Sequence, residues 1–275
     1  MELIQFAADP WGQKVPSHIA WSVMWLSLAA GLAFLAVHAA LAHFRAKSEA
    51  DPAPVPPELA ACVPPRAPRH TLAARIFHWL MAAAVIVLLC TAFLPRAGLR
   101  FDWLTLHWLA GSVLLLAVVF HLGHAVFSMD FWSIWPDLTD LGNLRNALVR
   151  LLGRTGVADR KPGKYPLGNK LFHLAALACG LCLAATGALL LVRVRTPFFT
   201  RDPYLLGDQA WGLVYLLHGF AGAALIALTI IHIYFALRPE KLPVTVAMIR
   251  GSMDRAYVLG HHDPSRWGCD GNGAK

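Results

Sequence analysis

The chain has 275 residues, of which 57% are hydrophobic and only 15% are Asp, Glu, Lys or Arg. Soluble domains carry about 25% charged residues, so this composition excludes an ordinary soluble protein and predicts an integral membrane protein. The net charge of +8 does not indicate nucleic-acid binding, because the basic residues lie in loops between apolar segments. The five cysteines have neither the spacing of a disulfide framework nor the Cys-x-x-Cys-His motif of covalent heme attachment.

Long segments without charged residues are spread along the chain. Residues 1–17 lack the basic start of a secretory signal, and the apolar segment after them is too long for one. Five segments contain no Asp, Glu, Lys or Arg: residues 18–44, 76–94, 103–129, 171–192 and 209–237. A helix needs about 20 residues to cross the hydrocarbon core, and each segment is long enough. Because backbone polar groups in lipid must bond internally, we predict five transmembrane helices.

The segment between the first two predicted helices, residues 45–69, is rich in Pro and Ala. This composition predicts an extended, partly disordered linker. It separates the first helix from a compact block of four. We therefore expect residues 1–69 to hold an N-terminal transmembrane helix and a cytoplasmic linker, and residues 70–275 to hold a four-helix bundle with a cytoplasmic tail.

The loops indicate the orientation. Most Lys and Arg residues follow the first, third and fifth segments, among them Arg66, Arg160, Lys161 and Arg250. The positive-inside rule then places the N-terminus outside and the C-terminus in the cytoplasm. In the second of these loops, residues 137–152 carry leucines at helical spacing, which predicts an amphipathic helix on the cytoplasmic surface.

Thirteen histidines are many for this length. Most lie in or at the ends of the charge-free segments: His18, His38, His43, His78, His107, His121, His124, His173, His218 and His232. Ionisable residues within membrane spans are rare and are functional candidates. A single one is most simply a hydrogen-bonded packing residue, but several in register indicate a shared task.

His218 and His232 are in register. They are 14 residues apart, about 21 Å along a helix, and share one face. One histidine therefore falls in each leaflet of a core about 30 Å thick. Two hemes stacked across a membrane need this arrangement, because heme iron takes an axial imidazole and the second axial ligand comes from a facing helix.

Depth in the membrane selects the partners. His78 and His232 lie near cytoplasmic helix ends, whereas His107 and His218 lie near outer ends. We therefore predict His78 with His232, and His107 with His218, as axial ligands of two heme irons. An alternative places His121 opposite His232, since His107 and His121 are also 14 residues apart.

Small residues near the outer pair favour the same interpretation. Gly111, Gly219 and Gly222 lie within four residues of an outer histidine, and glycine lets a flat macrocycle approach the backbone. The sequence leaves open whether a third heme uses other histidines of the spans: His38, His43, His121, His124 or His173.

Four motifs in order resemble a known family: Arg75-Ile-Phe-His-Trp79, Leu106-His-Trp108, Leu217-His-Gly-Phe-Ala-Gly222 and Ile231-His-Ile-Tyr234. They are similar to the gamma subunit of membrane-bound formate dehydrogenases, and to the diheme cytochrome b subunits of thiosulfate reductases and hydrogenases. Residues 163–170 resemble that family's cytoplasmic segment beside the quinone. The C-terminal Ile249-Arg-Gly251, His261-His262 and Trp267 resemble its tail. The similarity covers about residues 70–268.

The resemblance implies an all-α membrane fold, with a four-helix bundle that binds two b hemes through the same histidine pairs. The first helix is then an extra N-terminal transmembrane helix. The resemblance also implies a menaquinone or ubiquinone site near the inner heme. Lys164, Tyr165, Asn169 and Lys170 are the candidates to hydrogen-bond a quinone carbonyl, the alternative being headgroup contacts at a helix start. The expected location is the bacterial inner membrane, with the N-terminus periplasmic.

The function expected is electron transfer between a periplasmic partner and the quinone pool. The resemblance implies an iron–sulfur and molybdenum or tungsten protein as the partner, and a cytochrome c is a further candidate. The competing hypothesis is a heme-free membrane anchor or a histidine-lined metal-ion carrier. The sequence has no Gly-rich nucleotide loop, catalytic triad or carboxylate pair, so we expect no catalytic residues of a standalone oxidoreductase.

Overall fold

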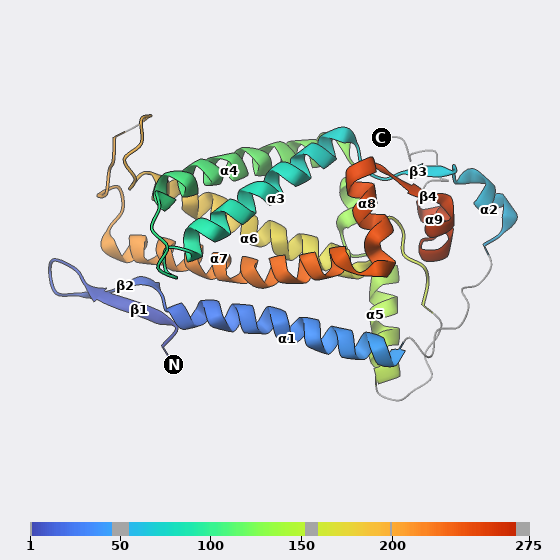
Figure 1. Ribbon diagram of the computed structural model, residues 1–275, viewed down its shortest axis with the longest axis horizontal. Coiled ribbons are helices and arrows are strands. Elements are labelled where there is room, and N and C mark those ends of the chain that lie inside the picture. The colour runs from blue at the N-terminus through green and yellow to red at the C-terminus, as the bar shows by residue number, and fades with distance from the viewer. Residues whose placement is uncertain (1, 46–54, 152–158, 199, 268–275) are drawn as a thin grey trace. The chain divides into compact units, whose positions relative to one another are not determined.

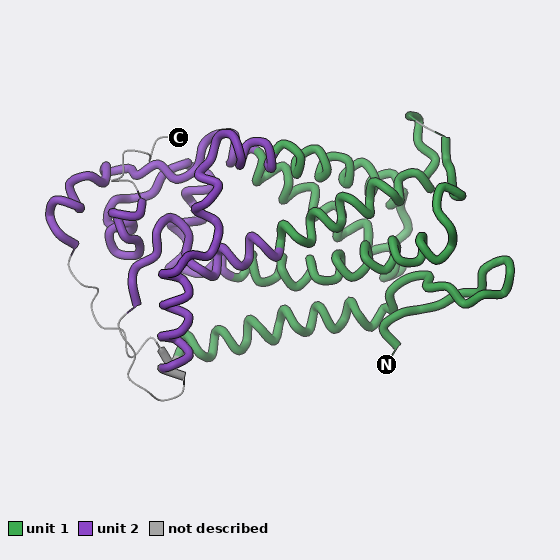
Figure 2. Tube along the Cα trace, turned by 180° about the vertical axis from the view of Figure 1, so that it is seen from behind, with its two compact units in different colours: residues 1–46, 77–120, 176–234 green, residues 47–76, 121–175, 235–275 purple. Residues whose placement is uncertain are grey.

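The computed structural model describes residues 2–45, 55–151, 159–198 and 200–267. These residues form two compact units (Figure 2). Unit 1 comprises residues 1–46, 77–120 and 176–234, and unit 2 comprises residues 47–76, 121–175 and 235–275.

Within the described residues, five helices are long and apolar enough to cross a membrane. They are α1 (Trp21–Arg45), α3 (Leu72–Phe93), α4 (Trp103–Ser128), α6 (Leu167–Leu191) and α7 (Asp208–Leu237). Each coincides with one of the charge-free segments to within a few residues. The predicted all-α integral membrane fold is confirmed.

Unit 1 is a bundle in which α3, α4, α6 and α7 run side by side, with α1 along α7 (Figure 1). Gly31 permits the close approach of α1, because a Cβ there would lie 3.2 Å from Ile230 Cδ1. Ser27 donates a hydrogen bond to the Ala223 carbonyl, and His38 Nδ1 lies 3.1 Å from the Tyr234 hydroxyl. The extra helix therefore packs on a helix of its own chain.

A β-hairpin that the sequence analysis did not predict precedes α1 in unit 1. Strand β1 (Ile4–Ala8) pairs antiparallel with β2 (Lys14–Ile19). The Asp9 carboxylate accepts hydrogen bonds from the backbone N–H groups of Trp11 and Gln13, and Gly12 adopts φ +79° in the turn. His18, expected at the start of a transmembrane segment, lies in β2 instead.

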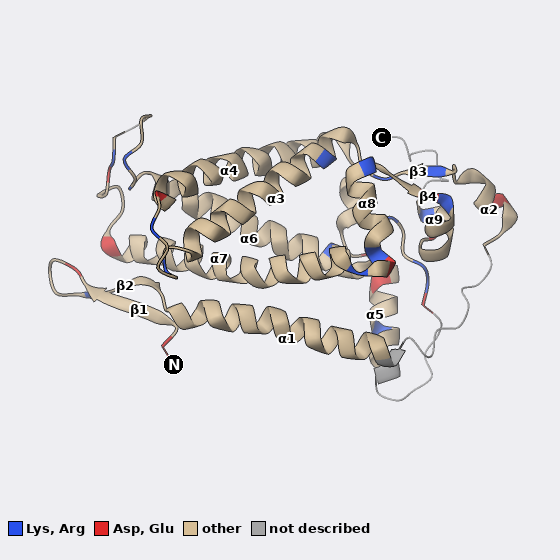
Figure 3. Ribbon diagram, viewed as in Figure 1, with Lys and Arg blue, Asp and Glu red and all other residues tan. Residues whose placement is uncertain are grey.

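Unit 2 contains the shorter elements: α2 (Pro57–Cys62), β3 (Arg66–Pro68), α5 (Leu138–Leu151), α8 (Leu242–Arg250), β4 (Ser252–Asp254) and α9 (Arg255–His261). Single 3-10 turns span Phe131–Ile134, Pro239–Lys241 and Pro264–Arg266. Helix α5 is the helix predicted for residues 137–152. Strand β3 pairs antiparallel with β4, with Ala67 opposite Met253. Lys and Arg residues gather in this unit and are sparse along the helices of unit 1 (Figure 3).

The prediction of an extended linker over residues 45–69 is wrong for its second half. Pro57 starts helix α2, where its missing N–H and fixed φ are tolerated. Val63 and Ala67 are buried in a core with Ala247, Met253, Val258 and Trp267. Residues 46–54 of this segment lie outside the described residues.

One cysteine departs from expectation. Cys62, at the end of α2, is disulfide-bonded, which the sequence did not predict. Cys90, Cys179 and Cys182 carry free thiols.

Candidate functional site

The helices of unit 1 bring four membrane-embedded histidines together in two pairs. The rings of His78 on α3 and His232 on α7 have centroids 6.1 Å apart, with planes inclined by 54°. The rings of His107 on α4 and His218 on α7 have centroids 6.3 Å apart, with planes inclined by 66°. These are the two pairs that depth in the membrane selected.

The spacing of each pair fits a six-coordinate heme iron. Two metal–imidazole bonds of about 2 Å, together with about 1 Å from each bonding nitrogen to its ring centre, span about 6 Å. The ring centroids of each pair, 6.1 and 6.3 Å apart, are therefore close to the separation that one iron between them requires. Helix α7 supplies one histidine to each pair.

Two threonines, which the sequence analysis missed, contact the outer pair. Thr91 Oγ1 on α3 lies 2.8 Å from His107 Nδ1, and Thr186 Oγ1 on α6 lies 2.9 Å from His218 Nδ1. Both threonines are buried, with 2% and 6% of their surface exposed. In the sequence each is the one hydroxyl residue of an apolar helix, a feature that marks a polar group in need of a partner but does not identify the histidine.

The glycines near the outer pair differ in what they face. Gly111 and Gly222 each follow an outer histidine by four residues and therefore share its helix face. A Cβ at Gly222 would meet no atom within 4 Å, and one at Gly111 would meet only Leu88 Cδ2, at 3.9 Å. These glycines leave space beside the imidazoles that a flat macrocycle can use. Gly219 leaves no such space, because a Cβ there would lie 3.0–3.1 Å from side-chain atoms of Ile19 in the hairpin.

A third imidazole pair lies in unit 2. The rings of His121 on α4 and His173 on α6 have centroids 5.8 Å apart. The structure thus places His173 beside His121, and His78 beside His232, rather than the alternative pairing of His121 with His232. Within the described ranges, no group of three or more His, Cys, Asp or Glu side chains is arranged to hold a metal ion.

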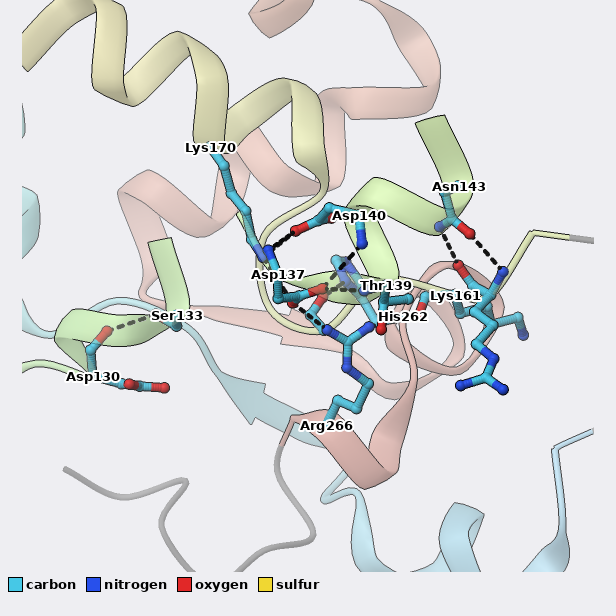
Figure 4. Close-up of polar contacts among 12 residues, drawn as sticks. Asp130, Ser133, Asp137, Thr139, Asp140, Asn143, Lys161, Lys170, His262 and Arg266 are labelled. Atoms are coloured by element: carbon cyan, nitrogen blue, oxygen red, sulfur yellow. Dashed lines mark hydrogen bonds and ion pairs between the residues drawn. The ribbon is translucent and has the colours of Figure 1, made fainter. Parts of the chain in front are cut away.

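The predicted quinone segment lies in unit 2, and one of its residues is already engaged. Lys170 at the start of α6 forms ion pairs with Asp140 at 2.6 Å and Asp137 at 3.1 Å (Figure 4). Arg266 of the tail binds the same Asp137 carboxylate at 2.6 Å. Asn169, in contrast, is exposed in the first turn of α6.

Lys164 and Tyr165 lie beside a buried arginine. The guanidinium of Arg69, itself 4% exposed, stacks over the rings of Tyr165 and Trp267, at 5.6 and 5.3 Å from their centroids. Burial lowers the pKa of Lys164, and the charge of Arg69 lowers it further. Burial raises the pKa of the Tyr165 hydroxyl. At neutral pH this tyrosine is a hydrogen-bond donor, and the lysine releases its proton more readily than an exposed one.

The C-terminal histidines belong to the folded tail. His262 is 3% exposed, its Nδ1 lies 2.7 Å from the Gly163 carbonyl oxygen, and its ring packs edge-on against Trp267. Since a carbonyl oxygen only accepts, His262 Nδ1 carries the proton of this hydrogen bond. Burial lowers the pKa of His262 to about 4, so it is neutral at physiological pH.

An apolar helical bundle that presents facing pairs of membrane-embedded imidazoles defines the class of membrane-bound b-type cytochromes. The comparisons with known proteins agree with this class. The chain belongs to the prokaryotic cytochrome b561 family, whose sequence pattern matches residues 69–251.

Two relatives within this family are subunits of formate dehydrogenases. The chain is 27% identical over 213 residues to the cytochrome b556(fdo) subunit of formate dehydrogenase from Escherichia coli K12, which covers 72% of this chain and 90% of that protein. It is also 27% identical over 205 residues to the cytochrome b556(Fdn) subunit of the nitrate-inducible formate dehydrogenase of the same strain, covering 70% and 86%. The resemblance to the formate dehydrogenase cytochrome b family is confirmed. The chain is a multi-pass membrane cytochrome b of the electron-transfer type, and its family implies heme b.

Proposed function

We propose that this protein is a diheme cytochrome b subunit that passes electrons between a periplasmic redox partner and the quinone pool. The observation that carries the proposal is the placement of two imidazole pairs, each about 6 Å between ring centres, along one helix. His218 and His232 are 14 residues apart on α7, about 21 Å along its axis. With one b heme bound at each pair, one heme would lie in each leaflet of the membrane.

Each of the two proposed heme sites has two histidines of this chain as its iron ligands. His78 and His232 would ligate the inner heme, and His107 and His218 the outer one. When bound, the hemes supply reversible one-electron chemistry. The apolar helices around the imidazoles exclude water, which favours neutral rings with a lone pair available to iron.

The proposed partners follow from the relatives, which are named as subunits of formate dehydrogenases. We propose an iron–sulfur and molybdenum or tungsten protein outside, or a cytochrome c, and menaquinone or ubiquinone as the second partner. The chain would lie in the bacterial inner membrane, with its N-terminus periplasmic and C-terminus cytoplasmic. Residues 70–275 would form the diheme domain, and residues 1–69 an N-terminal addition.

For the quinone we propose contacts from Lys164, Tyr165 and Asn169. The lowered pKa of Lys164 and the protonated Tyr165 hydroxyl suit groups that donate to a quinone oxygen. Lys170 already holds Asp137 and Asp140, so its proposed role is to fix the segment that carries the other three.

The test is a heme count with histidine variants. Purified protein reduced with dithionite should show a b-type spectrum and two hemes per chain by the pyridine hemochrome assay. His78→Ala and His107→Ala should each leave one heme, whereas His43→Ala on α1 should leave two. Quinol-linked reduction should stop in both ligand variants.

The competing outcomes are distinct. A protein without Soret absorbance would favour the heme-free anchor or metal-ion carrier. A count of three hemes that falls to two in His121→Ala would add the His121 and His173 pair as a third site.

A further inference from the structure

The two threonines beside the outer histidines are each committed to a second hydrogen bond. Thr91 Oγ1 lies 2.8 Å from the Val87 carbonyl oxygen, one helical turn earlier, and 3.1 Å from that of Leu88. Thr186 Oγ1 lies 2.6 Å from the Cys182 carbonyl oxygen. A carbonyl oxygen only accepts hydrogen bonds, so each hydroxyl donates its single proton to a backbone carbonyl of its own helix.

These backbone bonds determine which partner donates in the hydrogen bonds between the threonines and the outer histidines. With its proton committed, each threonine oxygen can only accept from the imidazole. His107 Nδ1 and His218 Nδ1, at 2.8 and 2.9 Å, must therefore carry the N–H. In a neutral imidazole the other nitrogen then has no proton. Both histidines thus present Nε2 as a bare lone pair.

We propose that Thr91 and Thr186 are positioning residues that fix the tautomer of both outer histidines and set the reduction potential of the outer heme. This inference rests on the proposed ligation of heme by His107 and His218. An acceptor on Nδ1–H draws the proton toward itself and raises the electron density on Nε2. A more electron-rich axial ligand stabilises ferric iron, so the two hydroxyls hold the potential of the outer heme down.

The burial of the threonines strengthens this effect. Both hydroxyls lie inside the bundle, where a low local dielectric strengthens each hydrogen bond and leaves no water to replace it. The histidines come from α4 and α7 and the threonines from α3 and α6. All four bundle helices therefore contribute to one heme site.

The test replaces the hydroxyl and keeps the shape. Thr91→Val and Thr186→Val remove the acceptor with little change in side-chain size. Redox titration should show a higher midpoint potential for one heme only, the one missing from His107→Ala, with a larger shift in the double variant. Thr91→Ser and Thr186→Ser restore a hydroxyl and should keep the wild-type potential.

Ser112→Ala is the matched control. Ser112 on α4 also donates to a carbonyl one turn earlier, that of Trp108 at 2.9 Å, and among the described residues its hydroxyl has no hydrogen bond with a histidine. Its replacement should leave both potentials unchanged. Valine variants that lose the outer heme while the helix content and the serine variants stay normal would also support the inference.

Two results would overturn it: unchanged potentials in both valine variants, or serine variants that shift as far as the valine variants. A second readout does not need heme. The 15N spectrum of histidine-labelled apoprotein should show Nδ1-protonated rings for His107 and His218, and loss of that signal in the valine variants. Wild-type protein that binds no heme would refute the proposed function, while the nitrogen spectra would still decide the tautomer.

Discussion

Lys170 Nζ lies 2.6 Å from Asp140 Oδ2, and both side chains are almost fully buried, with 5% and 6% of their surface exposed. Asp137 adds a second carboxylate at 3.1 Å and also binds Arg266 (Figure 4). The network joins the first turn of α6, the first turn of α5 and the C-terminal tail. A buried ion pair of this kind fixes one arrangement of these segments, because each charge is costly without its partner.

Lys170→Met should therefore destabilise the protein strongly. It leaves the Asp140 carboxylate buried without its cation, a change that costs about 3–5 kcal/mol in comparable sites. Thermal unfolding in detergent, followed by circular dichroism, should show a lower midpoint. The double variant Lys170→Met with Asp140→Leu should recover much of the loss, since no unpaired charge is then buried.

The exposed pair of Arg66 and Asp254 provides the comparison. Its atoms are 3.0 Å apart, but the side chains are 62% and 67% exposed. Arg66→Ala should change stability by less than about 1 kcal/mol, as for other surface pairs. Equal effects of Arg66→Ala and Lys170→Met would show that burial does not determine the strength of these pairs.

Acidification should destabilise unit 2 through His262. Burial holds its pKa at about 4 in the folded protein, below the ordinary value of 6.5. Between these values the unfolded chain binds more protons, so the free energy of unfolding falls as pH drops from about 6.5 to about 4. The full loss is roughly 3 kcal/mol.

His262→Asn isolates this contribution. The amide can still donate to the Gly163 carbonyl but does not titrate. Unfolding midpoints measured from pH 4 to 8 should fall less steeply with acidification in the variant than in the wild type. Identical slopes would mean that His262 is not responsible.

Much of the fold could be predicted because the membrane imposes simple rules. Segments without charge became helices, and the depth of each histidine in its helix selected the same neighbours that the structure shows. His232 meets His78, and His218 meets His107, because residues at one depth on facing helices have few other partners. Asp, Glu, Lys and Arg are absent from the middle of the five spans, because an ionised side chain is costly inside the membrane.

What could not be predicted depends on contacts between distant segments. Gly219 was expected to face a macrocycle, but the unpredicted hairpin places Ile19 against it. The burial of Val63 needs the C-terminal tail, whose approach no local pattern indicates. Thr91 and Thr186 were missed because a hydroxyl on an apolar helix shows its purpose only when the neighbouring helix is placed.

Gly212→Ala should disturb the contact between the hairpin and α7. A Cβ at Gly212 would overlap the Pro16 carbonyl oxygen, so β2 would have to move. We expect a lower unfolding midpoint and faster proteolysis of the N-terminal hairpin. Gly180→Ala on α6 meets nothing within 4 Å and should change neither. Equal protease resistance of both variants would show that the contact is dispensable.

Gly222→Leu should impair the outer heme site selectively. Gly222 lies one turn after His218 on the same face of α7, and a Cβ there meets no protein atom within 4 Å. If that space receives the macrocycle, a leucine side chain fills it and competes with the heme without requiring the protein to unfold. The pyridine hemochrome assay should fall toward one heme per chain, and the remaining heme should have the potential of the one retained in His107→Ala. Gly180→Leu, which adds the same side chain to α6 where there is also open space, should keep two hemes. A full complement of two hemes in Gly222→Leu would place the macrocycle on another side of His218, because a leucine and a porphyrin cannot occupy the same volume.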